Sequence, residues 1–227
     1  MYKSISKILI AIFTLIILFL AYLSFFGIKT QRFNNIIEEK IIKHVKFSVI
    51  EFQEIFIKFN PNTLSLVIST ENPNIFLKDK EFKLYKISSN ISIRQFLKNN
   101  ILIENLTIES KVNKIDNLIN ILRFYENNFQ TMILDKFIED GNLKFVANIN
   151  FHKNGHIKDD YLVKGQISDL NVELINKNKI ITDLDFKFVK DKITISNSSY
   201  KYKNIKFNSN AIILEDKKKE YKIFGDF

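Results

Sequence analysis

Cysteine and tryptophan are absent from this sequence, and its 227 residues include only five glycines and two prolines. Without cysteine there are no disulfide bonds, no thiolate zinc sites and no attachment point for the lipid of a bacterial lipoprotein. So few glycines argue against a phosphate-binding loop, and neither G-x-S-x-G nor H-E-x-x-H occurs. The composition therefore argues against nucleotide-dependent and thiolate-based catalysis.

Arginine is also scarce, although the formal net charge is +9. Nucleic-acid-binding proteins often have clustered arginine side chains. Here the lysines stand singly between apolar residues, and the only arginines are Arg32, Arg94 and Arg123. We therefore expect no nucleic-acid partner. The lysines fit solvated strand faces, with weak attraction to anionic lipid head groups as a second interpretation.

Candidate catalytic side chains are few. His152 and His156 flank Asn154 and Gly155, a pair typical of a tight hairpin turn, so we expect surface histidines and no metal site. Acidic neighbours in sequence point apart on a helix or strand, which applies to Glu38 with Glu39, Glu139 with Asp140, and Asp159 with Asp160. We predict that the protein is not an enzyme and uses no cofactor.

One long apolar run decides the expected location. Residues 8–26 read ILIAIFTLIILFLAYLSFF without a charge, which is enough for a helix to cross a hydrocarbon core. The run exceeds a usual signal-peptide core and no A-x-A pattern precedes Gly27, so we predict an uncleaved anchor that includes Ile8, Phe13, Leu18 and Phe26. A short inside tail would place the rest of the chain in the periplasm of a bacterium, tethered to the inner membrane.

Beyond the anchor, most of the chain alternates between apolar and polar residues with a period of two. Examples are LKFVANINF at 143–151, YLVKGQISDLNVELI at 161–175 and IITDLDFKF at 180–188. The phase changes after Leu84 and again at Ser168 and Asp169, which predicts bulges. Short connections predict antiparallel neighbours, so we expect a mainly β fold: a curled antiparallel meander that forms an open groove, with one or two packing helices.

Two stretches have helical spacing instead. Residues 31–43 predict a short helix, and residues 115–129 predict a second one that lies on the sheet, extends through Met132, Ile133 and Phe137, and ends at Gly141. We divide the chain into the tail and anchor (1–30), a helix with a first set of strands (31–112), a helical insertion (113–141) and repeating strands (142–227). The last strand begins near the end of the sequence, so we expect the chain to be part of a longer protein.

A family resemblance appears at residues 91–110, ISIRQFLKNNILIENLTIES. An aliphatic strand, the turn FLKNN and the pattern I-x-I-x-x-L-x-I resemble the N-terminal element of the AsmA family, the envelope proteins that include the YhdP-like and TamB-like types. The preceding anchor, helix and strands follow the same order, although Lys98, Asn99 and Asn100 stand where the family often has glycine.

The resemblance implies an apolar groove that carries phospholipid from the inner towards the outer membrane and supports the envelope, with other envelope proteins as further partners. Residues that we assign to the groove wall are Leu143, Phe145, Ile149, Phe151, Val163, Ile167, Leu184, Phe186, Phe188, Ile205, Phe207 and Ile213. Two alternatives remain: a lipopolysaccharide carrier of the LptC type, and an anchored scaffold or assembly subunit whose sheet face is an ordinary closed core.

Overall fold

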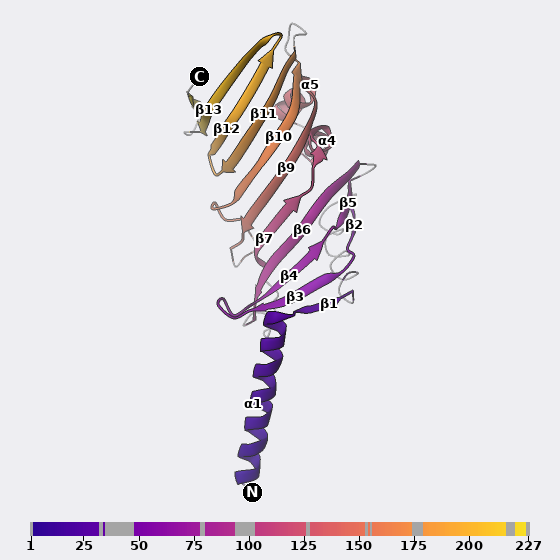
Figure 1. Cartoon of the computed structure of the whole chain (residues 1–227), viewed down its shortest axis with the longest axis vertical. Helices are drawn as coiled ribbons and strands as arrows, with labels where there is room; N and C mark the ends of the chain where they lie inside the picture. The colour runs from indigo at the N-terminus through magenta and orange to yellow at the C-terminus, as the bar shows by residue number, and fades with distance from the viewer. Residues whose placement is uncertain are drawn as a thin grey trace.

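The computed structural model describes residues 2–31, 34, 48–77, 80–93, 103–125, 128–152, 154, 156–173, 179–216 and 221–225. Within these residues the fold is mainly β, as predicted: one antiparallel sheet, a long N-terminal helix and two short helices. In Figure 1 the sheet is a twisted ribbon that leads away from the N-terminal helix.

The N-terminal helix α1 (Tyr2–Phe25) contains all of the predicted anchor segment except Phe26. Its segment Ile5–Phe25 has a mean hydropathy of 2.8, so it is long and apolar enough to cross a bilayer, a property that signal sequences share. Ile8, Phe13, Leu18 and Phe26 are all exposed, as side chains facing lipid would be. Beyond the helix, the Phe26 N–H donates to the Tyr22 carbonyl at 2.8 Å.

The strands form one continuous antiparallel order. From the end next to α1 it runs β1, β3, β4, β6, β7, β9, β10, β11, β12, β13, β14; β5 pairs with β6 and β2, and β8 pairs with β9. Within the described residues β1 and β14 do not pair with each other, so the sheet is open. The bounds are β1 (Ile28–Thr30), β2 (Ser48–Glu51), β3 (Ile55–Asn60), β4 (Ser65–Glu71), β5 (Asn74–Leu77), β6 (Lys80–Ser92), β7 (Ile103–Ser110), β8 (Asn113–Lys114), β9 (Ile138–Asn150), β10 (Leu162–Glu173), β11 (Lys179–Val189), β12 (Lys192–Tyr202), β13 (Ile205–Asp216) and β14 (Tyr221–Gly225).

Within the described residues two helices pack on the sheet, and they divide the single helical stretch that the sequence predicted from residue 115 to residue 137. α4 (Ile115–Tyr125) is followed by α5 (Phe129–Phe137), which begins with a capping box: the Thr131 N–H donates to Asn128 Oδ1 at 3.0 Å. The prediction that the helix ends at Gly141 is wrong. The backbone of Ile138 is already extended, and Gly141 lies inside β9.

The register of the sheet changes at both predicted phase changes. In β6 the pairing with β7 shifts between Leu84 and Lys86. In β10 the pairing with both neighbours shifts after Ile167, and Asp169 takes a left-handed conformation with φ 53°. The apolar alternation before and after each shift can therefore stay on one face of the sheet.

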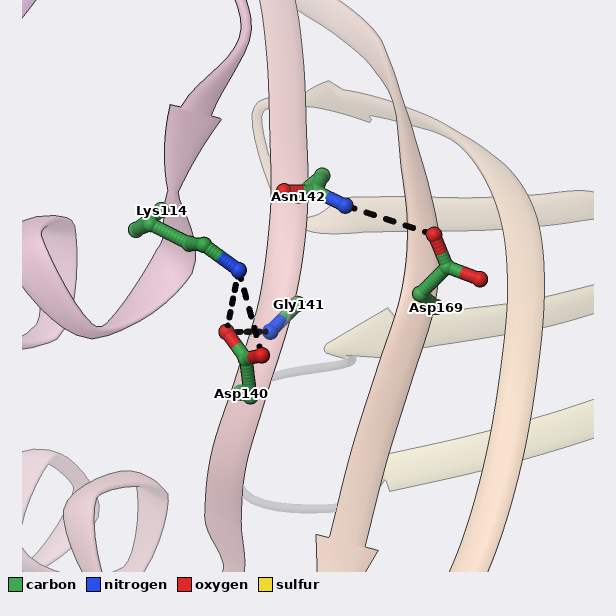
Figure 2. Close-up of polar contacts among 5 residues, drawn as sticks. All are labelled: Lys114, Asp140, Gly141, Asn142 and Asp169. Atoms are coloured by element: carbon green, nitrogen blue, oxygen red, sulfur yellow. Dashed lines mark hydrogen bonds and ion pairs between the residues drawn. The ribbon is translucent and has the colours of Figure 1, made fainter.

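Polar contacts hold the β10 bulge and the strand that leads into α4 (Figure 2). Lys114 of β8 donates to both carboxylate oxygens of Asp140, at 2.9 and 3.1 Å, and the Gly141 N–H donates to Asp140 Oδ1 at 2.8 Å. Asn142 Nδ2 donates to Asp169 Oδ2 at 3.3 Å. These contacts fix the start of α4 relative to β9 and β10.

The predicted helix at 31–43 falls almost wholly outside the described residues. Of this stretch, Asn34 is buried, and its Nδ2 donates to the carbonyl oxygen of Phe52 at 2.8 Å. The predicted second and fourth segments of the chain join in one sheet, because β7 pairs with β9.

Candidate functional site: an apolar face of the sheet

The most extended feature of the structure is a row of side chains that crosses the sheet from strand to strand. We call it the central row. Its members are directly paired in successive ladders and are apolar apart from one threonine: Ile55, Thr70, Ile87, Ile108, Ala147, Val163, Phe188, Ile193, Leu214 and Ile223. One apolar face therefore runs from β3, which contacts α1, to β14.

The opposite face is mainly polar. The paired row next to the central row contains Glu71, Lys86, Glu109, Val146, Lys164, Lys187 and Thr194, and it continues on β13 and β14 with the apolar residues Ile213 and Phe224. On the same face, Thr107 Oγ1 donates to Asn148 Oδ1 across β7 and β9 at 2.9 Å. The sheet is thus two-faced, as the alternation in the sequence requires.

Part of the apolar face is sealed by α4. Ile115 and Ile119 of α4 form a buried cluster with Leu143 of β9 and Leu170 of β10. Five of the predicted wall residues belong to this cluster or pack against it: Leu143, Phe145, Ile167, Leu184 and Phe186. Leu143 is buried in this cluster, and the other four are half-buried against it, so packing within the protein reduces the lipid-accessible area at these five positions.

The face is uncovered beyond the helix. Phe188 and Ile193 are each 37% exposed, and Ile205 and Phe207 are 57% and 53% exposed. Three further predicted wall residues, Ile149, Phe151 and Val163, are half-buried. The apolar face therefore has a covered part under α4 and an open part on β11 to β13.

The open part contains a hollow of about 700 Å³. Its lining comes from β11, β12 and β13: Ile180, Tyr200, Tyr202, Phe207, Asn208, Ser209 and Ile212. Of these, only Phe207 was assigned to the wall from the sequence. A hollow of this size falls in the range of small-molecule sites, and its lining is mostly aliphatic and aromatic.

A change of phase in β12 explains which residues the sequence missed. Asn197 has φ 50°, and the pairing of β11 with β12 shifts beside it, between Asp183 and Asp185. Tyr200 and Tyr202 then line the hollow. The sequence does not reveal this change of phase, because residues 196–199 read SNSS and contain no apolar residue that would show which face each position takes.

Ile213 is the predicted wall residue that the structure places elsewhere. It pairs with Thr194, which pairs with Lys187, so Ile213 belongs to the polar face. Its neighbour Ile212 pairs with Ile195 instead and lines the hollow. The sequence placed Ile213 in phase with Ile205 and Phe207, a phase that β13 does not keep along its length.

The two histidines of the repeating strands lie apart from the apolar face. His152 and His156 lie at the predicted hairpin, where the His152 N–H donates to the His156 carbonyl at 2.7 Å. In the described part of the chain, no group of three or more histidine and acidic side chains is arranged to hold a metal ion. The candidate site is therefore an apolar surface.

Comparison of the chain with models of known protein families, with curated proteins and with solved structures finds no match.

Proposed function

We propose that this protein is an inner-membrane-anchored periplasmic carrier of the AsmA type, whose apolar sheet face shelters the acyl chains of phospholipids between the two membranes. The observation that carries the proposal is the continuity of the central row, which joins the strands next to α1 with the open part of the face. A carrier needs such continuity, because a gap of polar side chains would expose the chains to water.

The energetics favour a long apolar surface over a single pocket. Each acyl methylene exposed to water costs about 0.8 kcal/mol, so a two-chain lipid with roughly thirty methylenes would face on the order of 20 kcal/mol in free transit. An apolar face removes most of this cost wherever the lipid lies along it. Specific polar groups are not needed for that role, in keeping with the apolar character of the candidate site.

A second candidate function is a scaffold or assembly subunit of the envelope with a closed core. The packing of Ile115 and Ile119 against Leu143 and Leu170 favours it locally, because there the face is already filled. The exposed Phe188 and Phe207 favour the carrier on the neighbouring strands. A lipopolysaccharide carrier would use the same apolar face with a different lipid.

The test is a transfer assay with two adjacent substitutions on β12. The full chain is placed in donor vesicles, and the movement of a fluorescent phospholipid to acceptor vesicles is followed. Ile193→Asp puts a charge on the central row, whereas Thr194→Asp puts the same charge on the polar face. The proposal predicts slower transfer for Ile193→Asp alone.

The thermal stability of both variants is measured in parallel. If Ile193→Asp does not fold, Ile193→Asn replaces it in the transfer assay. Equal transfer by the two folded variants would exclude the central row as the path of the lipid.

A further inference from the structure

The turn between β12 and β13 carries a distinctive set of side chains. Residues 200–207 read YKYKNIKF, and we call them the hairpin tip. In Figure 1 this turn lies at the upper end of the sheet, and α1 lies at the lower end. The hairpin tip is therefore remote from the helix that is long and apolar enough to enter a membrane.

The hairpin tip is strongly cationic. Lys201, Lys203 and Lys206 are exposed, and residues 192–214 contain no acidic residue. Lys201 pairs directly with Lys206 across the two strands, an arrangement of like charges that is unfavourable in itself. Among the described residues no ion pair involves any of these three lysines.

The same residues expose a large apolar surface. Ile205 and Phe207 are more than half exposed, and Tyr200 and Tyr202 line the adjoining hollow. Lys203 Nζ lies 5.5 Å from the centre of the Tyr202 ring, so cationic and aromatic groups stand side by side. Aromatic rings beside lysines are typical of the interface between a bilayer and water.

We propose that the hairpin tip docks on an anionic lipid surface. The lysines complement anionic head groups, and Ile205 and Phe207 supply apolar groups that enter the acyl boundary. Charge alone does not carry the inference. Lys164 and Lys187 are also directly opposed, but they lie on the polar face with Glu109 and Thr194 in their row. Docking of this kind goes beyond the carrier function, because it requires no lipid within the sheet.

The experiment uses the full chain held by α1 in nanodiscs of phosphatidylcholine. Binding of these nanodiscs to vesicles is measured by flotation, with vesicles of phosphatidylcholine alone or mixed in equal parts with phosphatidylglycerol. We expect binding to the mixed vesicles that falls as the ionic strength rises. Replacement of Lys201, Lys203 and Lys206 by Gln should weaken it by about 100-fold at low ionic strength.

A matched control replaces Lys144, Lys164 and Lys187 by Gln, which removes the same charge from the polar face and should preserve binding. The double variant Ile205→Ser and Phe207→Ser should weaken binding while it keeps all the lysines. Equal binding to vesicles with and without phosphatidylglycerol would overturn the proposal. An equal loss of binding in the hairpin-tip lysine variant and in the polar-face lysine control would also overturn it. If the unaltered chain does not bind the mixed vesicles but still transfers phospholipid, the docking site is rejected and the carrier function stands.

Discussion

The ring of Phe186 occupies the space that a side chain at position 165 would need. A Cβ atom added to Gly165 would lie 2.8 Å from Phe186 Cζ, 2.9 Å from Phe145 Cα and 2.3 Å from the Lys144 carbonyl oxygen. Gly165 pairs with Phe145 on one side and with Phe186 on the other. The Phe186 ring and the backbone of Lys144 and Phe145 therefore leave no room for a side chain at this point of β10.

The first prediction concerns this close approach. Gly165→Ala should lower the free energy of unfolding by about 1–3 kcal/mol, because a methyl group there displaces backbone as well as the Phe186 ring. Chemical denaturation of the full chain in detergent micelles measures it. Gly141→Ala is the control. A Cβ atom added there would lie 3.2 to 3.3 Å from its nearest neighbours, so this substitution should lower the free energy of unfolding by less. An equal loss in both variants would refute the specific role of Gly165.

Asn197 should determine which residues of β12 face the hollow. Its backbone has φ 50°, and its Nδ2 donates to Asp185 Oδ2 at 2.7 Å. Asn197→Gly keeps this backbone accessible, whereas Asn197→Val should destabilise the bulge by about 1–2 kcal/mol. Cysteine introduced at Tyr200 reports the outcome through its labelling rate. A Val variant with the stability and labelling rate of the Gly variant would contradict this account.

The carboxyl group of Asp140 should titrate below its usual range. The side-chain hydrogen bond from Lys114, and then the N–H of Gly141, lower its pKa. A lowered folded pKa gives stability that is present above the unfolded pKa and is lost as the pH falls through the folded pKa. Lys114→Gln should therefore raise the pKa of Asp140, as measured by carboxyl carbon NMR. Lys144→Gln should leave the pKa of Asp140 unchanged. An Asp140 pKa that is the same with and without the Lys114 side chain would count against the contact in Figure 2.

Much of the fold follows from alternation in the sequence. The bulges after Leu84 and Ile167 were predictable, because apolar residues on both sides reveal the change of phase. The bulge at Asn197 was not, since small polar residues surround it. The helix end at Phe137 was misplaced because glycine is common after helices, whereas Gly141 lies in β9.

The candidate site was less predictable than the fold. Alternation predicts that Leu143 and Phe188 both belong to the apolar face, but it does not predict which of them a helix covers. That difference depends on where α4 packs, which is a tertiary relationship: Leu143 is 3% exposed and Phe188 is 37% exposed. For the same reason a probe at Phe145 or Phe186, beside the α4 cluster, would report on packing within the protein.

Site-specific photocrosslinking in cells tests the central claim most directly, because it reports what touches one position on one face. A benzophenone side chain is placed at Phe188 or Phe207 on the open apolar face, and at Thr194 or Ile213 on the polar face. The account predicts that phospholipid is captured at the first two positions and is absent from the second two. Capture of protein alone at Phe188 and Phe207, or equal capture of lipid on both faces, would contradict it.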